Sequence, residues 1–287
     1  MASPDAVMPA PGPDTTFYGA PAGRRVTMRD LAEASRRGER WPMITAYDAM
    51  TAGIFEQAGV PALLVGDSAA MVVYGHDSTL PVTVADLLPL VKAVVRGSSR
   101  SLVIADLPFG SYQASPAQAL ETSAAFMKEG GAQAVKLEGG ASVLPQVEAL
   151  ASAGIPVIGH LGLTPQSVNL FGGYRVQGRG ESGDLLMRDA KALEASGAAA
   201  VVLEVVPADL AARVTEILSI PTIGIGAGPG TNAQVIVWQD LVGLGSGPAP
   251  RFVKRYADVR TLIGDAVRAW AGDVSSGAYP AEEHSYR

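Results

Sequence analysis

The sequence predicts an α/β fold, a (β/α)8 barrel with an extra helix towards the C-terminal end. Eight short apolar runs occur along the chain, each followed by glycine or an acidic residue, and amphipathic segments lie between them. Near-continuous hydrophobicity is typical of strands that are buried on both faces, as parallel strands are. Eight strand and helix units within about 200 residues favour a closed barrel. A doubly wound open sheet is the alternative, and it would have fewer strands and usually a nucleotide-binding fingerprint.

Each predicted element rests on its local sequence. The eight apolar runs, taken as strands, are residues 43–46, 62–65, 102–105, 134–137, 157–158, 199–203, 222–225 and 235–237. Helices are predicted over residues 117–129, 184–196, 208–218 and 258–271. The first of these helices follows Ser115 and Pro116, a favourable N-cap and first-turn pair, while Gly130 and Gly197 are natural C-terminal stops.

The composition indicates one large globular unit. Of 287 residues, 48% are apolar and only 17% are charged, so a large core is possible and disorder is excluded for most of the chain. Residues 1–23 contain five prolines and no basic residue. We therefore predict a disordered extension over residues 1–23 and a single barrel domain, including the helical tail, over residues 24–287.

Charge and cysteine content exclude several classes of function. The net charge of −6 and a pI of about 5.1 argue against a nucleic-acid partner or an anionic membrane surface. The absence of cysteine rules out disulfides, thiolate catalysis and cysteine-bound zinc. The longest uncharged stretch, residues 217–239, is interrupted by Pro221 and several glycines, so it is not a membrane span. Because residues 1–23 lack the features of a signal peptide, we expect a cytoplasmic protein.

Acidic residues stand at the ends of four predicted strands. These residues are Asp67, Asp106, Glu138 and Glu204. In a barrel the carboxyl ends of the strands form the active-site face, so four carboxylates would meet there and repel one another unless a cation is bound. Oxygen ligands without cysteine suit Mg²⁺. A single acidic residue after a strand is more often a helix N-cap, but the repetition on consecutive strands favours a site.

Two basic residues belong to the same predicted face. Lys136 and Glu138 are two positions apart on one strand, so both point into the barrel, where a bound carboxylate substrate would pair with the lysine. His160 follows the fifth strand, and it is either a hydrogen-bonded core histidine or a substrate contact.

From about Arg25 to the C-terminus, the chain resembles the ketopantoate hydroxymethyltransferase family. The segments that carry the resemblance are 66–68, 75–79, 105–109, 135–140, 159–167, 176–180, 224–228 and 283–285. The resemblance implies a (β/α)8 barrel of the phosphoenolpyruvate and isocitrate lyase type, assembled as a homodecamer or another homo-oligomer. One departure from the family pattern is Asn232-Ala233-Gln234, where the family more often has Asp-Gly-Gln.

The resemblance also implies a reaction and roles for the site residues. A one-carbon unit would pass from 5,10-methylenetetrahydrofolate to 3-methyl-2-oxobutanoate through an enolate stabilised by Mg²⁺, giving 2-dehydropantoate on the way to pantothenate. The magnesium positions would be Asp67, Asp106 and Glu138, and Glu204 would be the catalytic proton acceptor. The residues implied to hold the oxo acid, with His160 added as a candidate contact, are Asp67, Ser68, Asp106 and Lys136.

Three other functions are also compatible with the sequence. A magnesium-dependent C–C lyase is one, although such lyases carry a cysteine-bearing signature that this chain lacks. A metal-independent aldolase could use Lys136 to form a Schiff base. The third is a barrel that binds an oxo acid without catalysis.

Overall fold

The computed structural model describes residues 16–173 and 175–286. Contacts within the chain form two compact units, residues 1–236 and 237–287, so the predicted domain of residues 24–287 extends across both. In the predicted disordered extension, residues 1–15 lie outside the described residues. The prediction does not hold for residues 16–23, because Phe17 and Ala20 are buried and the Arg100 guanidinium lies over the Phe17 ring.

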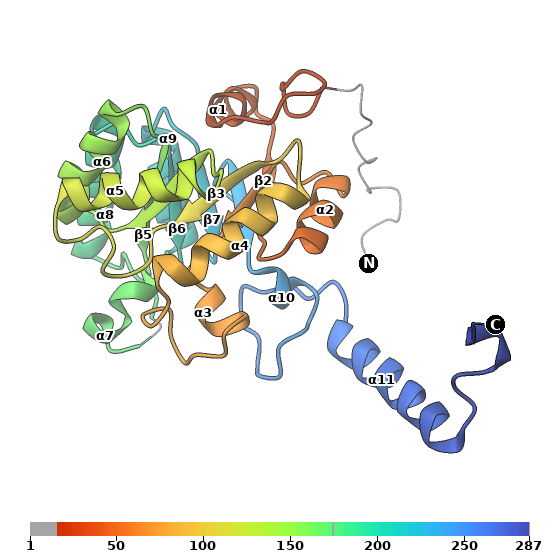
Figure 1. Ribbon diagram of the computed structural model, residues 1–287. Coiled ribbons are helices and arrows are strands. Elements are labelled where there is room, and N and C mark those ends of the chain that lie inside the picture. Colours follow the sequence, from red (N-terminus) through yellow and green to blue (C-terminus); the bar gives the residue numbers. More distant parts are fainter. Residues whose placement is uncertain (1–15, 174, 287) are drawn as a thin grey trace. The chain divides into compact units, whose positions relative to one another are not determined.

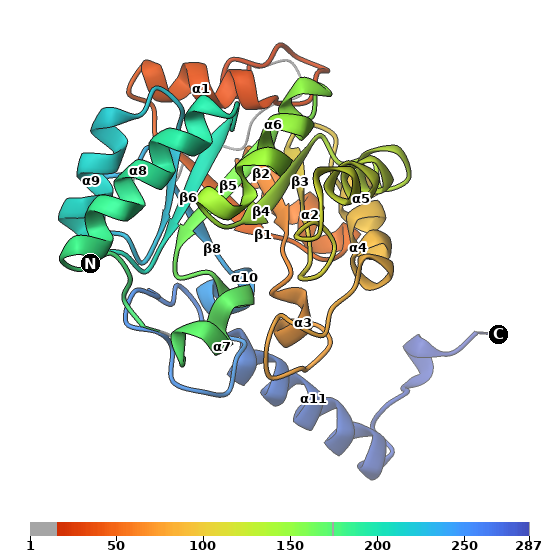
Figure 2. The ribbon, with the colours of Figure 1, turned by 90° about the vertical axis from the view of Figure 1, so that its left-hand side faces the viewer.

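Eight parallel strands close into a barrel in the order of the sequence (Figures 1 and 2). The strands are β1 (Trp41–Thr45), β2 (Ala62–Val65), β3 (Leu102–Asp106), β4 (Ala134–Glu138), β5 (Val157–Gly162), β6 (Ala200–Glu204), β7 (Thr222–Ile225) and β8 (Ala233–Ile236). The predicted barrel is confirmed, and the open-sheet alternative is wrong because β8 pairs with β1. The fifth strand, predicted to end at Ile158, continues to Gly162 and therefore contains His160.

The first unit also contains a helix that precedes β1 and the helices that connect the strands. They are α1 (Met28–Arg36), α2 (Ala49–Gln57), α3 (Ala69–Val72), α4 (Val84–Gly97), α5 (Pro116–Lys128), α6 (Leu144–Ser152), α7 (Val168–Phe171), α8 (Glu181–Ala195) and α9 (Ala208–Ile217), with short 3₁₀ turns η2 (Ala141–Val143) and η3 (Pro165–Ser167). As predicted, Ser115 caps α5 by accepting a hydrogen bond from the backbone of Gln118.

The second unit contains α10 (Trp238–Leu241), α11 (Val259–Ser276) and η4 (Glu282–His284). The predicted C-terminal helix is confirmed as α11, which extends five residues beyond the predicted end at residue 271. Among the described residues, no helix has the length and hydropathy needed to cross a membrane.

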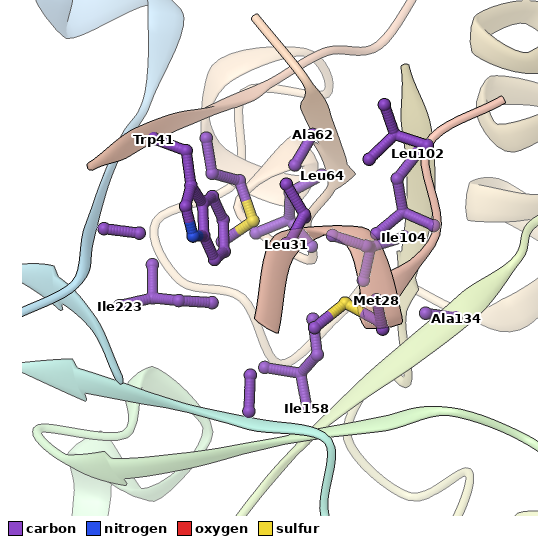
Figure 3. Packing of buried hydrophobic residues seen from close by; sticks show 14 of the residues in the cluster. Met28, Leu31, Trp41, Ala62, Leu64, Leu102, Ile104, Ala134, Ile158 and Ile223 are labelled. Atoms are coloured by element: carbon purple, nitrogen blue, oxygen red, sulfur yellow. The ribbon is translucent and has the colours of Figure 1, made fainter. Parts of the chain in front are cut away.

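Apolar side chains at alternate strand positions fill the barrel interior towards the amino-terminal ends of the strands. They are Trp41, Met43, Ala62, Leu64, Leu102, Ile104, Ala134, Ile158, Ala200, Val202, Ile223, Ala233 and Val235. Met28 and Leu31 of α1 belong to the same cluster, and Figure 3 shows Leu31 among the strand side chains. Helix α1 thus closes the amino-terminal end of the barrel, while α3 and α7 lie at the opposite end (Figures 1 and 2). The polar interior positions therefore gather at the carboxyl-terminal end.

Candidate active site

The strand register places the predicted site residues beside one another. On β4, Ala134 belongs to the apolar core and the next two positions on the same face are Lys136 and Glu138. Asp106 at the end of β3 is paired with Lys136, and Glu138 is paired with His160 on β5. Inward-facing strand positions are thus apolar towards the amino-terminal end of the barrel and charged at its carboxyl-terminal end.

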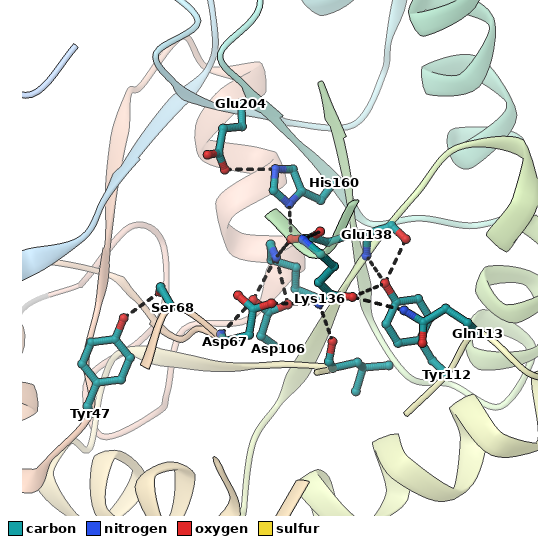
Figure 4. A network of polar contacts seen from close by, with 12 residues as sticks. Tyr47, Asp67, Ser68, Asp106, Tyr112, Gln113, Lys136, Glu138, His160 and Glu204 are labelled. Carbon is teal, nitrogen blue, oxygen red and sulfur yellow. Dashed lines mark hydrogen bonds and ion pairs between the residues drawn. The ribbon is translucent and has the colours of Figure 1, made fainter. Parts of the chain in front are cut away.

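Lys136 forms the centre of the site. Its Nζ lies 2.8 Å from Oδ1 and 2.9 Å from Oδ2 of Asp106, donating to both oxygens. The same nitrogen lies 3.5 Å from Oε1 of Glu138. Figure 4 shows the lysine between the two carboxylates. The negative partners of Lys136 therefore belong to the chain itself, whereas a substrate carboxylate was predicted to pair with it.

His160 links this cluster to Glu204 at the end of β6. Its Nδ1 lies 3.1 Å from Oε1 of Glu138, and its Nε2 lies 3.2 Å from Oε2 of Glu204, at ion-pair distance but without hydrogen-bond alignment. The side chains of Asp106, Glu138 and His160 are each 2% exposed, whereas that of Glu204 is 17% exposed. Of these four side chains, that of Glu204 is therefore the most accessible to a substrate.

The charges in the cluster depend strongly on one another. Burial raises the pKa of Asp67 well above its usual range, and the carboxylates of Asp106 and Glu138 raise it further. Burial also raises the pKa of Asp106, although Lys136 opposes this effect. Burial lowers the pKa of Lys136, but the surrounding carboxylates outweigh burial and raise it above the ordinary lysine value. Lys136 is therefore an ammonium ion at neutral pH.

The protonation of His160 follows from the same balance. Burial and the positive charge of Lys136 lower the pKa of His160, but Glu138 and Glu204 outweigh both and raise it to about 9. Burial likewise raises the pKa of Glu138, whereas Lys136 and His160 outweigh burial and lower it. At neutral pH His160 is consequently an imidazolium ion between two carboxylates.

Asp67 and Ser68 lie just after the end of β2. The backbone N–H of Asp67 donates to Oδ2 of Asp106 at 3.2 Å, which joins Asp67 to the cluster. Ser68 is half-buried and its Oγ lies 2.8 Å from the hydroxyl of Tyr47. Figure 4 shows the Tyr47–Ser68 pair beside the carboxylates.

The backbone around Glu204 is strained. Val205, a β-branched residue, has φ of 50°, a left-handed conformation that such residues rarely adopt. Strain of this kind costs about 1–3 kcal/mol and persists only where the surroundings hold it. Hydrogen bonds do so here, from the Val205 N–H to the Ile225 carbonyl and from the Gln177 N–H to the Val205 carbonyl. They hold the backbone directly after Glu204.

Gln166 and Tyr112 were missed as site residues by the sequence analysis. Gln166 contacts both Asp67 and Glu138, and the Tyr112 hydroxyl accepts a hydrogen bond from the backbone N–H of Glu138. Gln166 lies within one of the segments that carry the family resemblance, residues 159–167, which was the available signal. Tyr112 lies outside those segments, and its position could not be inferred from strand ends.

The cluster has the chemistry, though not a complete cage, for a divalent cation. Across residues 16–173 and 175–286, no group of three or more His, Asp or Glu side chains could hold a metal ion unaided. However, four carboxyl groups (Asp67, Asp106, Glu138 and Glu204) meet only two cationic side chains, Lys136 and His160, and the crowding raises the pKa of Asp67 and Asp106, an effect that a bound cation would oppose. Mg²⁺ usually binds one or two carboxylates and keeps several waters. The oxygen-rich donor set therefore fits this ion.

A cavity of about 290 Å³ adjoins the cluster. It lies between the ends of β4 and β5 and helix α8, and His160 forms part of its wall. Phe171, Leu185 and Leu186 line it with apolar surface, and Asp189 adds a carboxylate. The cavity can thus hold a second molecule next to His160.

Known proteins are similar to this chain over nearly its whole length. The family model of ketopantoate hydroxymethyltransferase matches residues 25–282. The chain belongs to this family. Among its relatives, the 3-methyl-2-oxobutanoate hydroxymethyltransferase of Frankia alni is 65% identical over 283 residues, covering 96% of this chain and 93% of the relative. The protein of the same name from Thermobifida fusca is 62% identical, with 96% and 98% covered. This ketopantoate hydroxymethyltransferase family member is therefore an enzyme, as the resemblance implied.

Solved structures support the predicted type of barrel. A phosphonopyruvate hydrolase, in complex with oxalate and Mg²⁺, matches this family member with a TM-score of 0.59 at 14% identity, covering 90% of this chain and 93% of that one. A 2,3-dimethylmalate lyase, described as a PEP mutase/isocitrate lyase superfamily member, matches with a TM-score of 0.57 at 17% identity, covering 91% and 92%. At these identities the likeness concerns the fold alone.

Proposed function

We propose that this enzyme transfers a hydroxymethyl group from 5,10-methylenetetrahydrofolate to 3-methyl-2-oxobutanoate, forming 2-dehydropantoate on the way to pantothenate. The observation that carries the proposal is the unbroken line of contacts from Asp106 through Lys136, Glu138 and His160 to Glu204. This line crosses the ends of four neighbouring strands, on the face where barrel enzymes have their active sites. The names of the relatives support the acceptor substrate.

Glu204 acts as the general base in this proposal. The C3–H bond of the oxo acid breaks and its proton moves to a carboxylate oxygen of Glu204, the most exposed carboxylate of the line. The resulting carbanion forms the new C–C bond to the methylene carbon of the folate, and water supplies the hydroxyl oxygen as tetrahydrofolate leaves. The imidazolium of His160, with Nε2 3.2 Å from Oε2 of Glu204, holds this carboxyl group in place.

The remaining polar residues bind and orient the oxo acid. Asp67, Asp106 and Glu138 would hold Mg²⁺ directly or through its waters. When bound, this ion supplies positive charge near the keto oxygen, where negative charge develops as the proton leaves. Lys136 and Ser68 orient the substrate oxygens, with the Ser68 hydroxyl held by Tyr47. An ammonium ion is a poor nucleophile, so the raised pKa of Lys136, to which its carboxylate neighbours contribute against burial, disfavours the Schiff-base alternative.

The cavity beside His160 is where we place the folate. Its apolar side chains suit a flat heteroaromatic ring, and Asp189 can accept N–H groups from the ring edge. A donor bound there would approach the acceptor from the side of His160.

Exposed apolar side chains recur at helical spacing along α11, and they support a homo-oligomeric assembly of this enzyme. These side chains are Ile263, Val267, Trp270 and Val274.

Proton exchange tests the first half of the reaction without the donor. In D₂O with Mg²⁺ and no folate, the enzyme should replace the C3 proton of 3-methyl-2-oxobutanoate by deuterium, because Glu204 can remove that proton alone. The measurement is the loss of the C3 signal in ¹H NMR, and chelation of the metal should stop it. Saturable binding of the oxo acid without any exchange would instead indicate a non-catalytic binding barrel.

Filling the cavity tests the second half. Leu185→Trp should raise KM for 5,10-methylenetetrahydrofolate by about tenfold, because overpacking a site by a large side chain typically costs about 1–3 kcal/mol. C3 deuterium exchange should stay at the wild-type rate, since the oxo acid lies elsewhere. Leu170→Trp is the control, because Leu170 is exposed on α7 and does not line the cavity. An unchanged KM in Leu185→Trp, or an equal loss of exchange, would contradict this placement of the folate.

A further inference from the structure

Gln166 connects two of the proposed magnesium positions. It lies in η3 and is only 6% exposed. Its backbone N–H donates to Oε2 of Glu138 at 3.0 Å, and its side-chain Nε2 donates to Oδ2 of Asp67 at 2.9 Å. One residue that follows β5 therefore holds two carboxyl groups, one from the turn after β2 and one from the end of β4.

The hydrogen bonds of the Gln166 amide leave it a single orientation. Its nitrogen faces two acceptors, the Asp67 carboxylate and the carbonyl oxygen of Leu107 at 3.0 Å. Its oxygen faces two donors, the Tyr112 hydroxyl at 2.8 Å and Nε2 of Gln113 at 3.2 Å. The orientation of Gln113 is itself determined, because its Oε1 accepts the backbone N–H of Gly110. Turning the Gln166 amide over would oppose like groups at both ends.

Gln166 also differs from Lys136 in carrying no charge. A cation that holds a carboxylate competes with a metal ion for its negative charge, whereas an amide donor fixes the carboxylate and leaves the charge available. Two of the three proposed metal residues thus have different supports: Asp106 is held by the Lys136 ammonium ion, and Asp67 is held by an uncharged donor.

We propose that Gln166 is a positioning residue that fixes the relative placement of Asp67 and Glu138 for the divalent cation. The inference rests on the proposed function, which places the cation at these carboxylates. Partners of this kind, one step removed from the metal, typically change metal affinity by about 10–100-fold when they are removed.

Gln166→Met tests the inference, because it keeps the side-chain length and the backbone N–H but removes the amide. Mn²⁺ binding, followed by electron paramagnetic resonance, should weaken by about 10–100-fold, and C3 deuterium exchange at subsaturating metal should fall in parallel. Thermal unfolding without metal shows whether the variant is folded. Gln166→Asn keeps the amide but is one carbon shorter, so it should lose the contact with Asp67 and weaken Mn²⁺ binding even if Gln166→Met fails to fold.

Gln146→Met is the matched control. Gln146 is an equally buried amide that bonds the backbone of Tyr112 and Gln113 but touches none of the carboxylates. A purely structural role of Gln166 predicts similar effects of Gln146→Met and Gln166→Met on Mn²⁺ binding, and that outcome would overturn the inference. So would wild-type Mn²⁺ affinity in folded Gln166→Met or Gln166→Asn. Wild-type protein that binds Mn²⁺ without exchanging deuterium would contradict the proposed reaction alone, whereas failure to bind Mn²⁺ would contradict both.

Discussion

Replacing Glu204 by Gln is expected to lower the rate of C3 deuterium exchange by about 10²–10⁴-fold, the usual cost of removing a general base. The amide cannot accept the proton, while its size and polarity preserve the surroundings of His160. The overall turnover should fall by a similar factor, because transfer of the methylene carbon requires the deprotonated oxo acid. Both rates are measured with metal and oxo acid at saturation, so that weaker binding does not contribute.

The control for this experiment is Glu216→Gln, which removes an exposed carboxylate from α9, outside the site. It should exchange deuterium at the wild-type rate. Full turnover by Glu204→Gln under saturating conditions would remove Glu204 from the role of base. Loss of turnover with normal exchange would assign Glu204 to a later step.

Replacing Lys136 by Met is expected to have the largest effect on stability, a loss of about 3–5 kcal/mol in the free energy of unfolding. The substitution removes the cation between Asp106 and Glu138, both buried at 2% side-chain exposure. Asp106 then loses the lysine that pairs with it, and Glu138 keeps its contact with His160. Urea-induced unfolding in the absence of divalent ions measures this loss.

Two variants separate this charge effect from packing. Lys191→Met removes an exposed lysine that pairs with Glu194 on α8, and its expected cost is below about 1 kcal/mol. Adding Asp106→Asn to Lys136→Met removes the carboxylate that lost its cation and should recover part of the lost stability. If Lys136→Met and Lys191→Met unfold at the same urea concentration, the buried cluster does not depend on Lys136 as we describe.

The positions of most strands were predictable because those strands are buried on both faces. Apolar runs such as those of β2 and β3 therefore stand out from the sequence around them. The strands with less regular burial were placed less well. The exposed Gln234 interrupts β8, so its predicted start at residue 235 falls two residues late. In β5, Gly159 and His160 obscured the continuation of the strand to Gly162.

The site residues were predictable in kind because parallel strands in a barrel all end at one face. Asp67, Asp106, Glu138 and Glu204 each follow or end an apolar run, so their shared location follows from connectivity. Their individual partners did not follow. The pairing of Asp106 with Lys136 depends on the register between β3 and β4, and the register of neighbouring strands has no local signature when both faces are apolar.

The sequence by itself determined the barrel, the family and the set of charged residues at the rim, because periodicity, chain order and motifs are properties of the chain alone. Only the tertiary structure decided that Lys136 neutralises Asp106, that His160 bridges Glu138 and Glu204, and that Gln166 joins Asp67 to Glu138. Contacts of this kind link residues 22 to 99 positions apart. They exist only when strand register and barrel closure bring those residues within hydrogen-bonding distance.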